Sequence, residues 1–304
     1  MGFIDLSGSL GRHFGSVGIA LNEISTRLSV TRANACQITG PSMERAKTCL
    51  AQLCQALNVS DKLNITIEAA IPEHVGLGSG TQMSLAIGSA LNAIYGLGLG
   101  VRDIAAFTER GLRSGIGIGI FERGGLVVDG GRGENTITPP VLVHLAVPSE
   151  WRFILVFDQR GQGLHGLQEI QAFKQLPPFP QQEAARLCYL LLMQGLPALA
   201  ENNLSKFGEV ISQLQQSVGE HFSSAQGGVF TSSEVAEAMQ WLAEQGAVAI
   251  GQTSWGPTGF CAVADSELVE TITCQARQRF AHFSNLSFIT ASARNSGADV
   301  LCYK

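Results

Sequence analysis

Residues 71–96, IPEHVGLGSGTQMSLAIGSALNAIYG, place three closely spaced glycines directly before an apolar helical pattern. Glycine tolerates positive φ and has no Cβ to obstruct an approaching ligand. The first backbone N–H groups of a helix lack partners within the helix, and they lie at the positive end of its dipole. Two interpretations follow: a phosphate-binding loop at a helix start, or a common glycine-rich turn with a Ser/Thr cap.

The phosphate-binding interpretation predicts a definite set of contacts. The backbone amides of the turn and the first helical residues are expected to hold a phosphate or diphosphate, and two hydroxyl groups add donors. The loop is not a Walker A motif, because it lacks Gly-Lys-Ser/Thr, and it does not fit the G-x-G-x-x-G pattern. The expected phosphate contacts are Gly76, Gly78, Ser79, Gly80, Thr81 and Gln82.

Composition limits the classes of function. The chain has 304 residues, of which 45% are hydrophobic and 15% charged, as is typical of a globular protein of two ordinary domains. The net charge is −5 and no Lys/Arg run is present, so no nucleic-acid partner is expected. Two of the seven cysteines, Cys49 and Cys54, lie on one helical pattern and are expected to pack in the core. We expect all seven to be reduced thiols of a cytoplasmic protein.

No segment predicts a membrane partner or a histidine-based metal site. The start, MGFIDLSGSL, lacks the basic and apolar regions of a signal peptide. The longest apolar run, near LCYLLLM, is too short to span a bilayer. The six histidines form no HExxH motif.

Hydrophobic periodicity predicts a mixed α+β chain. Residues 62–72 alternate apolar and polar side chains as a half-buried strand does, while residues 41–59 show helical spacing with Ser42 as N-cap. A continuous apolar run over residues 151–159 indicates a strand buried on both faces. The order of elements fits two domains. These are residues 1–150 and 151–304.

Two later segments carry further glycines, SGIGIGIFERGG (Ser114–Gly125) and SWGPTGFCAV (Ser254–Val263). Together with Pro72–Ser79 they resemble, in the same order, the three motifs of the GHMP kinase superfamily. The resemblance implies a two-domain α+β fold, with an N-terminal ribosomal-protein-like domain and a C-terminal ferredoxin-like domain. In this register Gly117 stands where many of the kinases have an aspartate for phosphoryl transfer, although some members lack it. Glycine cannot accept a proton, so the likeness to the kinases weakens here.

One branch of the superfamily fits more closely. GFIDLSGSLGRHFGSVGIALNE, GLGSGTQ and ARNSGA, with the two segments above, resemble the β-ribofuranosylaminobenzene 5′-phosphate synthases. This resemblance implies condensation of phosphoribosyl diphosphate with 4-aminobenzoate, with loss of CO2 and diphosphate, in tetrahydromethanopterin biosynthesis. Mg²⁺ is the expected cofactor, ATP is not required, and a homodimer would fit the fold. The alternatives are an ATP-dependent small-molecule kinase and a non-enzymatic ligand-binding member of the same superfamily.

Polar residues outside the loop supply the remaining candidates. Asp5 and Glu122 are the candidate catalytic acids, and each could equally be a cap or a surface ion partner. Arginine binds carboxylates with two parallel hydrogen bonds, so arginines in loops are candidate clamps for the benzoate, or else ordinary surface residues. A tryptophan in the third motif could form a wall for an aromatic substrate or fill the core. The expected substrate contacts are Arg12, Ser114, Gly115, Ser254, Trp255, Thr258, Arg294 and Asn295.

Two further expectations complete the set. Asp158, Arg160 and His165 follow the strand predicted to be buried, and they form a second-ranked group of candidates. Members of the synthase branch usually carry a strand with Arg and His before the segment that matches Gly2–Leu6, so contacts from such a strand are missing from these candidates. The metal ligands stay unassigned.

Overall fold

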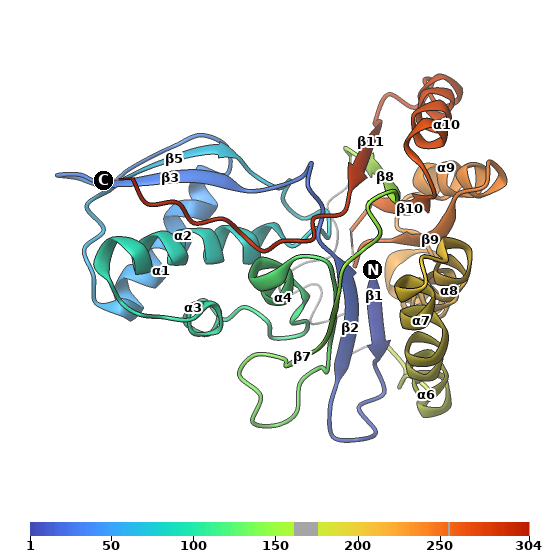
Figure 1. Ribbon diagram of the computed structural model, residues 1–304, viewed down its shortest axis with the longest axis horizontal. Coiled ribbons are helices and arrows are strands. Elements are labelled where there is room, and N and C mark those ends of the chain that lie inside the picture. The colour runs from blue at the N-terminus through green and yellow to red at the C-terminus, as the bar shows by residue number, and fades with distance from the viewer. Residues whose placement is uncertain (161–175, 255, 304) are drawn as a thin grey trace.

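The computed structural model describes residues 1–160, 176–254 and 256–303. Among these residues the strands form three sheets, and helices cover them, so the predicted α+β class is confirmed (Figure 1). No helix in the described segments combines the length and apolar composition needed to cross a membrane.

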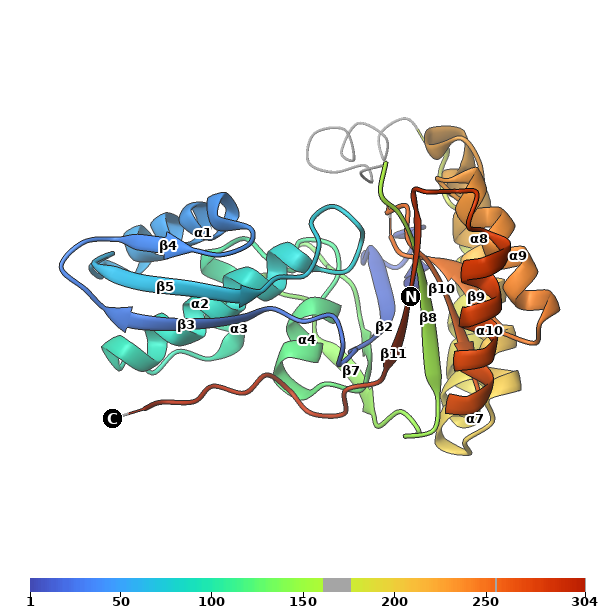
Figure 2. The ribbon, with the colours of Figure 1, turned by 90° about the horizontal axis from the view of Figure 1, so that it is seen from above.

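The first sheet has the strand order β3-β5-β4, and α1 and α2 pack beside it (Figures 1 and 2). The predicted alternation is confirmed, because β5 shows buried and exposed side chains in turn. The buried side chains of β5 meet those of α1, including Cys49 and Cys54, in one apolar cluster. The elements are β3 (Arg27–Arg32), β4 (Gln37–Thr39), α1 (Met43–Leu57), β5 (Leu63–Ala69), α2 (Ser79–Tyr95) and α3 (Val101–Phe107).

The central sheet is antiparallel, with the order β1-β2-β6-β7. The helix α4 packs against α2, β2 and β6, although its sequence contains two glycines that lower helix propensity. The sequence did not predict α4, β1 or β7, since tertiary packing overrides weak local signals there. The elements are β1 (Gly2–Asp5), β2 (Phe14–Ile19), α4 (Ile116–Arg123), β6 (Leu126–Asp129) and β7 (Val141–Leu145).

The third sheet has the order β11-β8-β10-β9, and the chain passes through it as a ferredoxin-like βαββαβ unit. The strand β8 is buried along nearly its whole length, as its apolar run predicts. The strands are β8 (Arg152–Asp158), β9 (Val248–Gln252), β10 (Gly259–Val263) and β11 (Leu286–Ser292). The helices are α6 (Gln181–Leu190), the π-helical turn η1 (Leu191–Gly195), α7 (Leu196–Ala200), α8 (Leu204–Gln226), α9 (Ser233–Glu244) and α10 (Ser266–Arg279).

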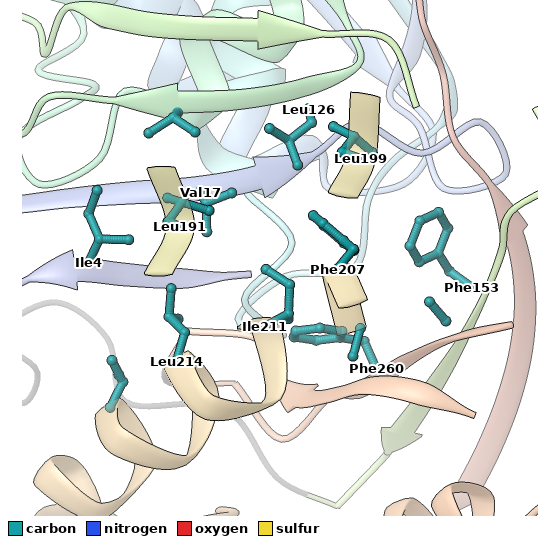
Figure 3. Packing of buried hydrophobic residues seen from close by; sticks show 14 of the residues in the cluster. Ile4, Val17, Leu126, Phe153, Leu191, Leu199, Phe207, Ile211, Leu214 and Phe260 are labelled. Atoms are coloured by element: carbon teal, nitrogen blue, oxygen red, sulfur yellow. The ribbon is translucent and has the colours of Figure 1, made fainter. Parts of the chain in front are cut away.

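One apolar cluster joins the central sheet to the third sheet and its helices (Figure 3). Val17 and Leu126 come from the central sheet, while Phe153, Phe207 and Phe260 come from beyond residue 150. All five are buried. Separating the two sheets would therefore expose apolar surface, at a free-energy cost of about 25 cal/mol for each Å² exposed. The predicted domains at 1–150 and 151–304 thus share a core.

A buried carboxylate fixes the end of β8. Asp158 is 5% exposed and accepts hydrogen bonds from Arg160 Nη2 at 2.9 Å, Ser232 Oγ at 2.7 Å and Asn285 Nδ2 at 3.0 Å. Ser232 is also the N-cap of α9, where its hydroxyl accepts from Val235 N. Burial alone would raise the pKa of Asp158, but these hydrogen bonds outweigh it and hold the pKa well below its usual range. The carboxylate therefore ties β8 to α9 in its charged form.

This linkage predicts a specific acid sensitivity. A depressed pKa gives stability that is present above the ordinary aspartate pKa and is lost as the pH falls towards the folded-state pKa. Asp158→Asn should lower the free energy of unfolding at pH 7 by roughly 1–3 kcal/mol, because a charged hydrogen-bond acceptor is lost. It should also flatten the decline of that free energy below about pH 5. Urea unfolding between pH 7 and pH 3 tests this, with the exposed Asp61→Asn as control; equal slopes for both variants would contradict the assignment.

Candidate phosphate and substrate site

The glycine-rich loop leaves the start of α2 open. Gly76 and Gly78 have φ values of 74° and 75°, which place both in the left-handed region that favours glycine. Gly78 is the N-cap and supplies no side-chain cap, so the first amides of the helix lack a capping partner from this position. A Cβ added at Gly78 would meet no atom within 4 Å. Free amides and free space at a helix start suit a phosphate group.

The third glycine motif packs directly on this loop. Thr253 Oγ1 donates to Val75 O at 2.7 Å, although the two residues are 178 positions apart in the chain. A Cβ at Gly76 would stand 2.5 Å from Thr253 Oγ1 and 2.8 Å from Ser254 O, so only glycine fits. A Cβ at Gly256 would likewise stand 2.5 Å from Val75 O. The first and third motifs are therefore one structural unit.

The candidates of the third motif occupy different environments. Ser254 is exposed beside the loop, where a ligand can reach it. Thr258 is completely buried, and its Oγ1 finds no hydrogen-bond partner among the residues that the structure describes, while its carbonyl accepts from Thr253 N. Trp255 lies outside the described residues.

The second motif meets the loop from α4. A Cβ at Gly117 would stand 2.9 Å from Thr81 Cγ2 and 3.1 Å from Thr81 Cβ. Gln82, one of the predicted phosphate contacts, donates from Nε2 to Gly117 O at 2.8 Å, so its side chain is hydrogen-bonded within the protein. The position that the resemblance assigns to the kinase aspartate is thus closed by contact between the starts of α2 and α4.

A buried aspartate that the sequence did not suggest holds the second motif in place. Asp129 is fully buried at the end of β6, and it accepts from Gly115 N at 2.9 Å and Gly131 N at 2.8 Å. Its carboxylate also accepts from Ser16 Oγ and from Ser114 Oγ. Burial raises the pKa of Asp129, and these hydrogen bonds oppose the rise. Asp129 therefore holds Ser114 and Gly115 in position. The sequence feature that could have indicated this role is an acidic residue between an apolar strand and two glycines, in LVVDGG.

The two candidate catalytic acids have local partners. Asp5 Oδ1 accepts from Ser7 N at 2.8 Å and Ser7 Oγ at 2.7 Å, which makes a turn within the β1–β2 hairpin. Glu122 faces Arg102, with 3.6 Å between Oε1 and Nε. Within the described segments neither carboxylate has a hydrogen bond or ion pair to residues 76–82. Their catalytic roles stay predictions.

The remaining loop candidates bind mainly to backbone. Arg12 Nε and Nη2 donate to Gly130 O and Gly131 O, at 2.8 and 2.9 Å. Asn295 exchanges two 2.8 Å hydrogen bonds with the backbone of Val147. Arg294 Nη2 donates to Gly297 O at 2.8 Å and pairs with the exposed Asp299, also at 2.8 Å. These contacts fix loops around the centre of the fold, and substrate contact by these three stays a prediction.

Two arginines that the sequence did not suggest lie against the first turn of α2. Arg45 Nη1 and Arg110 Nη1 would stand 2.9 and 3.1 Å from a Cβ at Gly80. They come from α1 and from the turn after α3, so only the folded chain brings them together. No local motif in the sequence signals this meeting.

The residues present do not make a magnesium site of their own. In the described part of the chain, no group of three or more His, Cys, Asp and Glu side chains could hold a metal ion. Mg²⁺ commonly binds through substrate phosphates with few protein carboxylates. Binding of Mg²⁺ through the phosphates of a ligand stays a prediction.

The packing of the two loop glycines predicts different sensitivities. Alanine at either position must adopt positive φ, which costs roughly 1–2 kcal/mol. Gly76→Ala adds a clash with Thr253 and Ser254 and should cost a further 1–3 kcal/mol, roughly, whereas Gly78→Ala should not. Chemical unfolding of the two variants measures the difference. Equal losses of stability would show that the first and third motifs do not depend on each other.

Comparisons with known proteins agree with this geometry. The chain matches the GHMP kinases N terminal domain over residues 44–124 and the GHMP kinases C terminal family over residues 196–282. Solved structures give the fold: homoserine kinase from Cytophaga hutchinsonii has a TM-score of 0.66 at 17% identity, covering 92% of this chain and 90% of that one. Mevalonate kinase from L. major has a TM-score of 0.67 at 16% identity, covering 93% and 90%.

Proteins related in sequence identify a narrower family than the solved structures do. The β-ribofuranosylphenol 5′-phosphate synthase of Archaeoglobus fulgidus is 33% identical over 310 residues, covering 98% of this chain and 95% of the relative. The protein of the same name from Methanocaldococcus jannaschii is 32% identical, covering 71% of this chain and 74% of the relative. The chain therefore belongs to the GHMP kinase superfamily and, within it, to the family of the β-ribofuranosylphenol 5′-phosphate synthases.

Proposed function

We propose that this protein joins phosphoribosyl diphosphate to 4-aminobenzoate through a carbon–carbon bond, releasing CO2 and diphosphate without ATP. The observation that carries the proposal is the open start of α2, where Gly78 supplies no side-chain cap and a Cβ at this position would meet no atom within 4 Å. A diphosphate leaving group suits such a site. The names of the sequence relatives, which specify a ribosyl phosphate joined to an aromatic ring, support the same reaction class.

The reaction needs charge stabilisation and positioning more than a nucleophilic side chain. The C1–oxygen bond of the ribose breaks, and its electron pair leaves with the diphosphate. The ring carbon that bears the carboxylate attacks C1 and forms the new bond. Loss of CO2 then returns the electron pair to the ring and restores aromaticity. The amides from Gly78 to Gln82 would hold the departing diphosphate, and Mg²⁺ bound to it would supply further positive charge.

A second acceptor is favoured by the relatives' printed name. A ribofuranosylphenol carries a hydroxyl group where the product from 4-aminobenzoate carries an amine. Loss of CO2 from 4-hydroxybenzoate would give that phenol by the same bond changes. Both acceptors place an electron-donating group opposite the attacking carbon, so the proposal holds for either.

The kinase alternative is less favoured by the geometry. Phosphoryl transfer to an alcohol commonly uses an acid that orients the hydroxyl group. Gly117 offers none, and Thr81 occupies the adjacent space. A cytoplasmic location, a homodimer and a place in tetrahydromethanopterin biosynthesis accompany the synthase proposal as further predictions.

One assay separates these functions. Purified protein with phosphoribosyl diphosphate, Mg²⁺ and carboxyl-labelled 4-aminobenzoate should release labelled CO2 without ATP, and carboxyl-labelled 4-hydroxybenzoate serves as the second acceptor. Gly78→Val, which fills the open space, should abolish release; because valine at positive φ also strains the backbone, circular dichroism must show that the variant is folded. Consumption of ATP with a small alcohol, and no CO2 from either benzoate, would overturn the proposal. Binding of the donor without any product would instead indicate a ligand-binding protein.

The closed position at Gly117 gives a further prediction. Gly117→Asp should not create ATP-dependent phosphoryl transfer, because the new side chain meets Thr81. Its negative charge beside the diphosphate should raise the KM for phosphoribosyl diphosphate roughly tenfold. Gly117→Ala is the matched control, since it adds the same Cβ without the charge and should raise KM less. A gain of ATP-dependent turnover in Gly117→Asp would contradict the assignment.

A further inference from the structure

Two guanidinium groups converge on one point beside the open helix start. Arg45 Nη1 and Arg110 Nη1 lie 2.9 and 3.1 Å from the position of a Cβ at Gly80, which is the second residue of α2. Arg45 Nη1 also donates to Ser79 Oγ at 3.4 Å, and Arg110 Nε donates to Ser84 Oγ at 3.2 Å. Both arginines are thereby held against the first two turns of the helix, and the absence of a side chain at Gly80 leaves room for them.

The charges at this point are not balanced. Arg45 pairs with Glu73 at 2.8 Å, whereas Arg110 has no carboxylate partner among the described residues. Burial alone would raise the pKa of Glu73, but the Ser42 hydroxyl and Arg45 outweigh it, so the pKa is lowered and the group stays charged. Two arginines and one glutamate leave an excess positive charge, and the dipole of α2 adds to it. Like charges held close together cost free energy unless an anion lies between or beside them.

Local backbone geometry holds these groups. His74, between Glu73 and the glycine loop, has φ 60°, and its Nε2 lies 3.2 Å from Arg45 Nη2. Glu109 has φ 52°, and the next residue, Arg110, donates its backbone N–H to Ala105 O at 2.8 Å. Positive φ at residues other than glycine is unfavourable and persists where the surroundings impose it. Arg110 therefore follows a turn that is set in an uncommon conformation, while Arg45, which lies on α1, contacts His74 in another.

We propose that Arg45 and Arg110 form a clamp for the diphosphate end of the substrate, beside the amides of the α2 start. This inference rests on the proposed function, since it specifies how the same site distinguishes a diphosphate from a single phosphate. Guanidinium groups bind phosphate oxygens with paired, charge-assisted hydrogen bonds. The amides bind one phosphate group, and the two arginines neutralise the additional negative charge of the second. The clamp would also stabilise the charge that develops on the leaving group.

Binding of inorganic diphosphate tests the clamp without requiring turnover. Isothermal titration of the full chain with diphosphate and with phosphate, each with Mg²⁺, gives the affinity ratio of the two anions. Arg110→Met should weaken diphosphate binding roughly 10- to 100-fold, because a charge-assisted contact is lost, and should weaken phosphate binding less. Arg110→Lys should recover part of the loss, since the charge returns without the paired geometry. Arg45→Met should act in the same direction.

The matched control lies at the opposite end of the same helix. Arg32, at the end of β3, donates to Ile94 O at 2.8 Å and its guanidinium lies over the Tyr95 ring, so Arg32→Met removes an arginine that contacts the end of α2 without touching its start. This variant should bind both anions as the parent protein does. Unchanged diphosphate affinity in both Arg45→Met and Arg110→Met would overturn the clamp, even if CO2 release succeeds. Arginine-dependent diphosphate binding without CO2 release would uphold the clamp and reject the proposed reaction.

Discussion

The hydrogen bond from Thr253 to the carbonyl of Val75 joins two loops 178 residues apart at the point where ligand binding is proposed. The loop that begins there must turn with positive φ at Gly76 while it packs on the turn at Ser254. Once that turn is fixed, α2 starts at a glycine N-cap that makes no side-chain cap and that leaves open space where a Cβ would stand. The proposed anion site therefore depends on a contact between two loops that lie far apart in sequence.

A second contact, between Gly117 and Thr81, supports the proposal that a protein with the kinase fold carries out another chemistry. Closing the second motif on the loop brings Gly117 against Thr81, where a kinase would place its acid. Asp129, buried behind Ser114 and Gly115, keeps that motif in place with its hydrogen bonds. What remains is a site rich in backbone donors and positive charge. Such a site can support the departure of an anion without activating a hydroxyl group.

Local patterns predicted much of the fold. The alternation in β5, the helical spacing in α1 and the apolar run of β8 were sufficient, because each element buries the face that its pattern shows. Ser42 does stand at the N-cap of α1, but it has φ 57° and makes no cap bond. Its hydroxyl forms a hydrogen bond with Glu73 instead, and no local sequence pattern predicts this contact. The helix α4 escaped prediction because its glycines lower helix propensity, and its packing against α2 and β6 compensates.

The site was predictable as three motifs but not as an arrangement of charges. Glycines at positive φ mark the loop in the sequence, whereas Arg45 and Arg110 meet only after α1, α2 and α3 have packed. We propose that the amides at the start of α2 bind the diphosphate of the ribose donor. Amide NMR of the labelled protein during titration with phosphoribosyl diphosphate reports on these amides one by one. The signals of Gly78, Ser79 and Gly80 should shift first and furthest, whereas saturable shifts confined to other parts of the chain would contradict the account.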